Sequence, residues 1–254
     1  VENKASGFAV PEMEIARRDI RYRSPVYFTP LLDESHVDAG ALRELVAEEY
    51  RKAGIRRESV DTGAIIITGE TSRKENARAV LDALSDFAGE FVVATAGPDL
   101  ESVLAAKGAG AVDYSQRTGK TVLHMDIGGG TTGMAFLKDG KVIRIEDEPT
   151  GGVHLSLVLA GNYHVSFQEA EAIKQDYRRH KEIFPVVRPV VEKMASIVRR
   201  YLSATPADAI YLCGGTCCLT GIETVFERET GVRTVKPADP FLVTPTGIAM
   251  NCKL

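Results

Sequence analysis

The chain has 254 residues, of which 44% are hydrophobic and 26% are charged, and its formal net charge is −4. These values predict a globular protein with a substantial core, and the lack of a basic stripe argues against nucleic acid as a partner. No run of about 18 apolar residues predicts a membrane span, the opening Val1-Glu2-Asn3-Lys4 is unlike a signal peptide, and the cysteines are expected to be reduced thiols. We therefore expect a cytoplasmic protein without a membrane partner.

The first 120 residues alternate short apolar runs, which are typical of buried strands, with segments of helical spacing. Strands are expected within residues 5–31, 61–68 and 91–94, and helices at 39–53, 74–87 and 100–109. Gly54 would end the first helix, and Asp99 fits the N-cap position of the last. This alternation of strands and helices points to an α/β fold.

The most informative segment is residues 125–133, which read Met-Asp-Ile-Gly-Gly-Gly-Thr-Thr-Gly between two apolar runs. The runs at 121–125 and 135–137 predict antiparallel strands, and Asp139-Gly140 predicts the hairpin turn that follows them. Three glycines and two threonines in the connecting turn would present backbone N–H groups and hydroxyls, which form a nest for an anion. Asp126 at the mouth of the nest suits Mg²⁺, which brings carboxylate and phosphate together. A glycine-rich turn without a ligand is the alternative.

The second half of the chain continues with a polar turn at residues 147–152 and then becomes mainly helical. Helices are expected at 153–159, 166–179, 185–202 and 219–230, and a strand at 209–212. Ser166 and Glu169 have the spacing of a capping box at the start of the second of these helices. The best position for a domain boundary is near residue 120, within the polar stretch 115–120.

A second glycine turn follows the strand at 209–212 and reads Cys213-Gly214-Gly215-Thr216. A double glycine lets a flat ring or a phosphate approach the backbone closely, although close packing alone is the alternative explanation. Between the two glycine turns, Glu171 and Lys174 lie on one helix face at i,i+3. An ordinary intrahelical ion pair is the alternative reading of these two residues.

Together these features resemble the actin, Hsp70 and sugar-kinase superfamily of ATPases. The resemblance implies an α/β, actin-like (ribonuclease H-like) fold of two lobes, each with a mixed sheet flanked by helices. The N-terminal lobe would comprise residues 1–120. The C-terminal lobe would comprise residues 121–254 and would carry both glycine turns, with a helical insertion at 151–205.

The same resemblance implies that the chain binds ATP with Mg²⁺ and assigns roles to individual residues. Asp126 would contact a water ligand of Mg²⁺, and Asp99 and Glu101 would orient the attacking water. Helix capping is the alternative role of Asp99. The other implied contacts are Gly128, Gly129, Gly130, Thr131 and Thr132 for the β- and γ-phosphates, Glu171 and Lys174 for the ribose, and Gly214, Gly215 and Thr216 for the base.

Two closer resemblances divide the chain between two families of one pathway. The segments at residues 147–152, 157–162 and 188–194 are similar to the ethanolamine-utilisation protein EutJ, a chaperone-like member of the superfamily. The segments at residues 24–30, 59–71 and 94–102 resemble EutA, the reactivating factor of ethanolamine ammonia-lyase. The chain thus reads as a mosaic of the two families, for which a natural hybrid, a fragment, a fusion and an artificially joined sequence all stay open.

In one respect the chain departs from the superfamily. The family pattern has a first phosphate hairpin, Asp-x-Gly-Thr, at the start of its fold, and no such sequence occurs here before residue 126. Loss of one side of a preorganised phosphate site would cost several kcal/mol of transition-state stabilisation. From the sequence we therefore expect weak nucleotide binding and, at most, a weak ATPase.

The family resemblances imply an ATP-dependent, chaperone-like reactivating factor that acts on ethanolamine ammonia-lyase, a cobalamin enzyme, and releases its damaged cofactor. Residues 33–40 have the wrong spacing for a cobalamin-binding motif, so the chain is not expected to hold cobalamin itself. Association with a bacterial microcompartment and a homodimeric state are left open. The alternative is a non-hydrolysing interaction or scaffold protein in the same pathway that kept the fold. A filament former and a small-molecule kinase are ranked lower.

Overall fold

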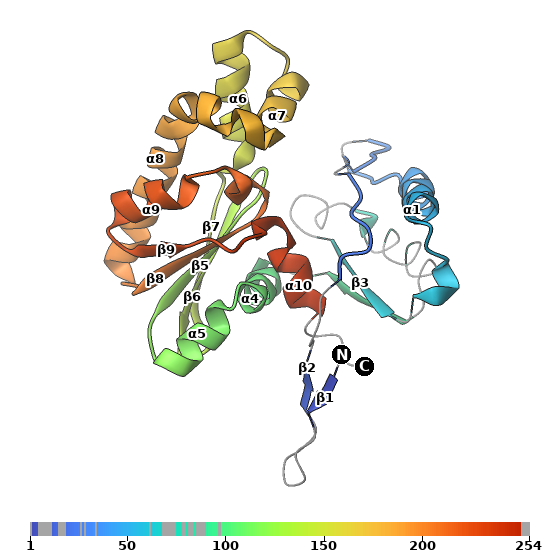
Figure 1. The fold of residues 1–254 in the computed structure, drawn as a ribbon, viewed down its shortest axis with the longest axis horizontal. Coiled ribbons are helices and arrows are strands. Elements are labelled where there is room, and N and C mark those ends of the chain that lie inside the picture. The colour runs from blue at the N-terminus through green and yellow to red at the C-terminus, as the bar shows by residue number, and fades with distance from the viewer. Residues whose placement is uncertain are drawn as a thin grey trace. The chain divides into compact units, whose positions relative to one another are not determined.

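A computed structural model describes the backbone of residues 2–4, 12–14, 19–25, 27, 29–33, 35–60, 62–67, 75–77, 80, 84, 90–95 and 98–249 (Figure 1). The chain divides into two compact units, one reaching to Thr95 and one from Ala96 to Asn251. Among the described helices, none is long and apolar enough to cross a membrane.

In the first unit, the residues that the structure describes form two small sheets and one long helix. Strands β1 (Glu2–Lys4) and β2 (Glu12–Glu14) pair antiparallel, whereas β3 (Thr62–Ile67) and β4 (Glu90–Thr95) pair parallel. Helix α1 (Ala39–Ala53) has the predicted bounds. Asp38 accepts a hydrogen bond from the Ala41 N–H at its start, and Gly54 adopts the left-handed conformation at its end.

The described residues test two of the expected elements of this unit only in part. Residues 19–25, within the segment expected to contain short strands, form no strand. The helix expected at residues 74–87 lies largely outside the described residues. Val80 and Leu84, which the structure does describe there, are helical and pack with Val37 against α1.

The second unit is built on a five-stranded sheet in the order β7-β6-β5-β8-β9. Its strands are β5 (Val122–Ile127), β6 (Thr132–Lys138), β7 (Lys141–Glu148), β8 (Ala209–Cys213) and β9 (Arg233–Val235). The first three form antiparallel hairpins, and β8 and β9 are added parallel to β5. Asp139 and Gly140 both have positive φ angles, as the predicted tight turn between β6 and β7 requires.

Helices cover both faces of this sheet (Figure 1). On one face lie α4 (Pro98–Gly108), α5 (Ala111–Thr118) and α10 (Val243–Ala249). The other face is covered by α8 (His180–Ala204) and α9 (Ile222–Thr230), whereas α6 (Gly152–Tyr163) and α7 (Phe167–Gln175) lie beyond the end of the sheet, where α6 contacts α8. The side chains of β5 alternate between the two layers, since Leu123 and Met125 enter the core under α8 whereas Val122 packs toward α5. Because β5 is buried on both faces, its sequence reads as a continuous apolar run.

Several predicted helix bounds need correction. Helix α7 ends at Gln175 instead of reaching residue 179, where a separate 3₁₀ turn (Tyr177–Arg179) lies. Helix α8 begins at His180 and continues through Pro185 and Pro189, because its apolar stripe of buried side chains holds it against the sheet. Helix α9 begins at Ile222, after a 3₁₀ turn (Gly215–Cys218) and a short connection. Helix α4 begins at Pro98, so Asp99 lies inside its first turn and is not the N-cap.

The domain boundary expected near residue 120 stays a prediction. The division at Thr95 places α4 and α5 in the second unit, where both pack against β5 and β6. Helices α5 and α10 and strand β9 were not expected, because each has only three to eight residues and gives too short a pattern to indicate an element.

Helices α4 and α10 lie side by side (Figure 1). Two glycines, one on each helix, face each other closely where the helices meet. A Cβ atom on Gly108 would overlap the Val243 carbonyl oxygen, and one on Gly247 would overlap the Leu104 carbonyl oxygen. The two backbones therefore touch without intervening side chains, as glycine allows.

This crossing gives a stability prediction. We expect Gly108→Ala to lower the unfolding free energy by about 1–3 kcal/mol or more, because the added methyl group has no space. Gly161→Ala is the matched control, since a Cβ on Gly161 in α6 meets no atom within 4 Å. In that helix interior alanine should stabilise by up to about 1 kcal/mol. Urea denaturation followed by far-ultraviolet circular dichroism measures both, and equal effects of the two substitutions would contradict the crossing.

Candidate functional site

The turn between β5 and β6 is held by hydrogen bonds to its carbonyl groups. The Gly128 N–H donates to the Thr131 carbonyl at 2.9 Å and closes the turn. The Gly128 carbonyl accepts from the Gly152 N–H at 2.9 Å and from Thr216 Oγ1 at 2.8 Å. The Gly129 carbonyl accepts from the Val153 N–H at 2.8 Å. The turn is thereby fastened to the start of α6 and to the second glycine turn.

This arrangement fixes the direction of the neighbouring N–H groups. In a trans peptide the C=O and the following N–H point in opposite directions, and no described peptide bond is cis. With the carbonyls of Gly128 and Gly129 turned toward α6, the N–H groups of Gly129 and Gly130 point the other way. Both residues are exposed, and neither N–H donates to another residue that the structure describes. Two successive outward N–H groups form an anion nest.

Three glycines outside the β5–β6 turn allow this turn to lie close to α6 and to the second glycine turn. A Cβ atom on Gly151 would lie 2.6 Å from the Gly129 carbonyl oxygen, and one on Gly152 would lie 2.6 Å from Thr216 Oγ1. Gly214 has a φ of +92°, and a Cβ there would overlap Asp126 Oδ1. Two turns distant in sequence therefore meet only because these three positions have no side chain.

Asp126 lies near the end of β5, just before the turn that forms the nest, and its carboxylate faces Gly214 of the second glycine turn. Its Oδ2 accepts a hydrogen bond from Thr244 Oγ1 of α10 at 2.7 Å. Burial raises the pKa of Asp126, and hydrogen bonds from Thr244 and Cys213 oppose that shift. Across the sheet Asp126 pairs with Gly133, which in turn pairs with Asp147 of β7.

A metal ion would need more ligands than this carboxylate. Among the described residues no group of three or more His, Cys, Asp or Glu side chains could hold a metal ion. Mg²⁺ is commonly bound through one or two carboxylates together with substrate phosphates and water. Asp126 next to an anion nest fits this mode of binding.

The Glu171–Lys174 pair is present and joins α7 to α6. Lys174 Nζ donates to Glu171 Oε2 at 2.7 Å, to Ser156 Oγ at 2.8 Å and to the Gly152 carbonyl at 3.0 Å. Burial acts to raise the pKa of Glu171, but hydrogen bonds from Lys174, Ser156 and Gln175 outweigh it and lower that pKa. Since an ammonium group has three protons, Lys174 has no donor left over in this arrangement.

His180 links this pair to the second glycine turn, and sequence reasoning missed it. Its Nδ1 lies 3.1 Å from the Thr220 N, whose N–H must donate to it, so the proton of a neutral ring is on Nε2. Nε2 lies 3.1 Å from the Lys174 carbonyl oxygen and donates to it. Nothing in the sequence signals these contacts, because the partners come from separate elements.

The other predicted site residues divide into three groups. The hydroxyls of Thr132 and Thr216 donate to the carbonyls of Thr150 and Gly128, so both serve the scaffold. Gly215 and Thr131 are exposed beside the two turns. Asp99 and Glu101 lie in the first turn of α4, and their side chains lie outside the described part of the structure.

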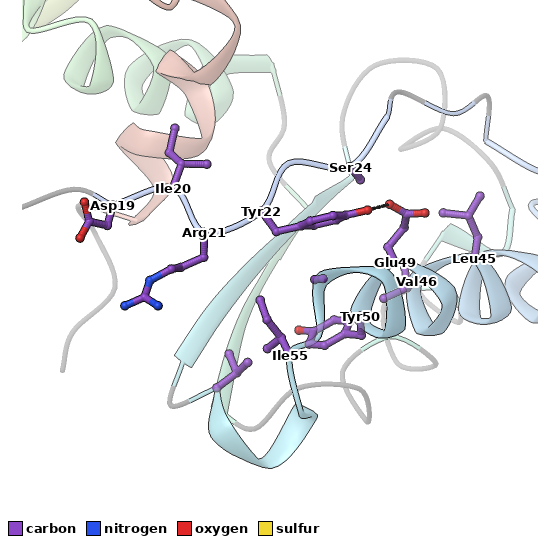
Figure 2. Close-up of a pocket in the computed structure, with 12 residues that line it drawn as sticks. Asp19, Ile20, Arg21, Tyr22, Ser24, Leu45, Val46, Glu49, Tyr50 and Ile55 are labelled. Atoms are coloured by element: carbon purple, nitrogen blue, oxygen red, sulfur yellow. Dashed lines mark hydrogen bonds between the residues drawn. The ribbon is translucent and has the colours of Figure 1, made fainter.

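A groove of about 760 Å³ in the first unit contains none of the predicted site residues (Figure 2). Tyr22, Tyr50 and Ile55 are among the residues that line it. Its buried carboxylate, Glu49, accepts hydrogen bonds from Lys52, Tyr22 and Tyr27. These bonds lower the pKa of Glu49 to about 2. Glu49 therefore holds Tyr22 and Tyr27, which precede α1 in the chain, against this helix.

A buried histidine lies two residues before Asp126 on the same face of β5. His124 Nε2 is 3.2 Å from Cys213 Sγ, while its Nδ1 has no hydrogen-bond partner among the residues that the structure describes. Burial lowers the pKa of His124 to about 3 and raises the pKa of the Cys213 thiol well above its ordinary value. Both side chains are therefore neutral near pH 7.

Comparison with known proteins identifies relatives in one pathway. A family model described as "Ethanolamine utilisation protein EutA" matches residues 1–208. The "Ethanolamine ammonia-lyase reactivase EutA" of Escherichia coli K12 is 48% identical over 140 residues, which are 55% of this chain and 30% of that protein. The "Ethanolamine utilization protein EutJ" of Salmonella typhimurium is 44% identical over 126 residues, which are 49% of this chain and 44% of that protein. The matches span less than half the length of these curated relatives.

Solved structures agree with the expected fold. EutJ from Carboxydothermus hydrogenoformans aligns with a TM-score of 0.66 and 39% identity, covering 84% of this chain and 74% of that one. MreB5 of Spiroplasma citri aligns with a TM-score of 0.60, covering 88% and 78%, and its 19% identity supports the fold alone. The predicted actin-like fold and the resemblance to both ethanolamine-utilisation families are confirmed.

The buried His124 gives a prediction about acid stability. An unfolded chain takes up this proton near pH 6.5, whereas the folded protein does so only near pH 3. Between these values the unfolded state binds more protons, so stability falls as the pH is lowered. We expect the wild type to lose up to about 1.4 kcal/mol per pH unit below pH 6.5 relative to His124→Gln. Urea titrations from pH 7.5 to 4.5 measure the difference, and a difference independent of pH would contradict the prediction.

Proposed function

The chain belongs to the EutA family of ethanolamine utilisation proteins, and from that premise we propose that it is an ATP-dependent, chaperone-like reactivating factor for ethanolamine ammonia-lyase. The observation that supports the ATP part of the proposal is the pair of outward N–H groups at Gly129 and Gly130, in the turn that directly follows the strand of Asp126. The lyase part rests on the family and on the printed name of the Escherichia coli relative.

In this proposal the two glycine turns hold the nucleotide. The nest at Gly129 and Gly130 receives the β- and γ-phosphates, and Asp126 holds a water ligand of Mg²⁺. The Mg²⁺ ion, when bound, neutralises phosphate charge and so assists phosphoryl transfer. Gly214, Gly215 and Thr216 flank the base, and Glu171 faces the ribose. Because Lys174 donates only to protein groups, its role is to fix Glu171 and the first turn of α6.

The reactivating step would follow from a nucleotide-dependent change in the shape of this chain. Bound phosphate would order the turn that is fastened to α6 and, through Thr216, to the second glycine turn. A change transmitted through these segments would act on the lyase, so that damaged cobalamin leaves. Asp99 and Glu101 are proposed to orient the attacking water. The proposal places the protein in the cytoplasm, associated with a microcompartment and paired as a homodimer.

One observation favours the alternative of a non-hydrolysing interaction protein. Three of the side-chain donors expected at the nucleotide, Thr132, Thr216 and Lys174, donate to protein groups instead. A site left with backbone donors and the exposed hydroxyl of Thr131 would bind phosphate without the charge stabilisation that turnover needs. Replacing the Asp126 carboxylate distinguishes the two functions, because only the ATP-dependent function requires it for reactivation of the lyase.

Asp126→Asn tests nucleotide binding. We expect Mg²⁺-dependent binding of ATP, measured by isothermal titration, to weaken at least about tenfold in this variant, because a neutral amide attracts the hydrated Mg²⁺ ion less strongly than a carboxylate does. The substitution should not unfold the protein, since it removes a charge that burial disfavours. Asp139→Asn is the matched control at the opposite end of β6, where asparagine tolerates the positive φ angle. Equal binding by both variants would contradict the assignment.

A second experiment tests the action on the lyase. We expect this chain with ATP and Mg²⁺ to restore activity to ethanolamine ammonia-lyase that carries inactive cobalamin, and Asp126→Asn to abolish the effect. Restored activity is measured together with the released corrinoid. Reactivation that persists in Asp126→Asn would favour the non-hydrolysing alternative. No release of corrinoid in either case would overturn the reactivating role.

A further inference from the structure

A groove of about 480 Å³ lies between α8 and α9, in the second unit. We call it the α8–α9 groove. Phe184 and Pro185 of α8 and Val225 of α9 give it an apolar lining, and Gly221 lies at its end. Gly221 has a φ of +88°, and a Cβ atom there would lie 3.5 Å from the Phe184 ring. Because glycine occupies this position, no side chain fills the space beside Phe184.

Three cationic side chains surround this apolar lining. They are Lys181, Arg188 and Arg228. Arg188 and Arg228 both donate to Glu192 Oε1 at 2.7 Å, and Arg228 also donates to Glu229. Lys181 is exposed and makes no ion pair with any residue that the structure describes. Three positive charges therefore face two carboxylates, and the rim keeps a positive charge although the whole chain has a net charge of −4.

An apolar lining with a positive rim selects for a ligand of matching character. Arginine recognises carboxylates through two parallel hydrogen bonds, and an excess of positive charge attracts acidic partners and orients them. A volume of this size accommodates one apolar side chain with adjoining backbone. A short peptide with carboxylates on both sides of an apolar residue fits both features.

We propose that the α8–α9 groove binds a short acidic segment of a partner protein, with an apolar side chain against Phe184 and carboxylates facing Lys181 and Arg188. This surface is separate from the glycine turns, and the proposal does not require that the chain binds nucleotide.

The groove is connected to the candidate nucleotide site through one side chain. His180 lines the groove and bonds on one side to Thr220, which follows the second glycine turn. On its other side it bonds to the carbonyl of Lys174. A peptide seated in the groove therefore contacts the residue that joins these two elements. If a peptide bound at His180 changes the affinity for nucleotide, then nucleotide binding changes the affinity for the peptide by the same factor, because coupling between two sites is reciprocal.

Fluorescence anisotropy with the full chain tests the proposal in the absence of nucleotide. The probe is the fluorescein-labelled peptide Glu-Asp-Glu-Phe-Glu-Asp-Glu. We expect saturable binding that weakens with added salt, because exposed charges are screened. Replacement of the peptide Phe by Ser should weaken binding roughly tenfold, since the apolar contact is lost.

Two variants with a matched control locate the binding. Lys181→Glu should weaken binding roughly tenfold by turning attraction into repulsion, and Thr224→Trp should block the groove, which Thr224 lines. Lys193→Glu is the control, because Lys193 is exposed on α8 and does not line the groove. Circular dichroism shows that each variant is folded.

Four outcomes would overturn the proposal. They are the absence of saturable binding, equal losses in Lys181→Glu and Lys193→Glu, equal affinity of the Phe and Ser peptides, and equal competition by a single-stranded DNA of the same charge. The first would remove the site, and the others would reduce it to non-specific attraction between charges. None of them bears on the titration of ATP against Asp126→Asn.

Discussion

The carbonyl oxygen of Gly128 accepts two hydrogen bonds, and the candidate site depends on them. One comes from the first turn of α6 and the other from Thr216, so a single atom joins three segments. Because these bonds hold the carbonyl inward, the N–H of Gly129 is turned outward, and the bond from the Val153 N–H to the Gly129 carbonyl does the same for the N–H of Gly130. The anion nest is therefore a product of packing between distant segments. Without the bonds from α6 and Thr216, the glycines alone would allow many conformations of the turn.

Many of the predicted local features came from short-range patterns in the sequence. The hairpin at Asp139-Gly140, the capping box of Ser166 with Glu169 and the pair of Glu171 with Lys174 all involve residues that are at most three apart. Such features depend on short-range geometry, which sequence spacing reports directly. Family resemblance supplied the fold and the two glycine turns. The comparisons confirm the fold, whereas the ligand roles of individual residues stay predictions.

Contacts between distant segments could not be read from spacing. Thr244 donates to Asp126 across 118 residues of sequence, and Thr220 donates to His180 across 40. Helix α10, which carries Thr244, has seven residues and no clear apolar periodicity, so nothing marked it in advance. The hydroxyl of Thr216 points to a backbone carbonyl and not toward the proposed ligand, because its direction is set by packing. Tertiary structure decides which polar groups remain available for chemistry.

The crossing of α4 and α10 has a consequence for how this sequence can change over generations. In most helix contacts a larger residue on one side can be accommodated by a smaller one on the other, so paired replacements keep the volume constant. At Gly108 and Gly247 no smaller residue exists, and the obstacle to a new side chain is the opposing backbone. A change at either glycine therefore has no compensating partner in the facing residue. We expect suppressors of such a change to lie in the loops that set the spacing of the two helices.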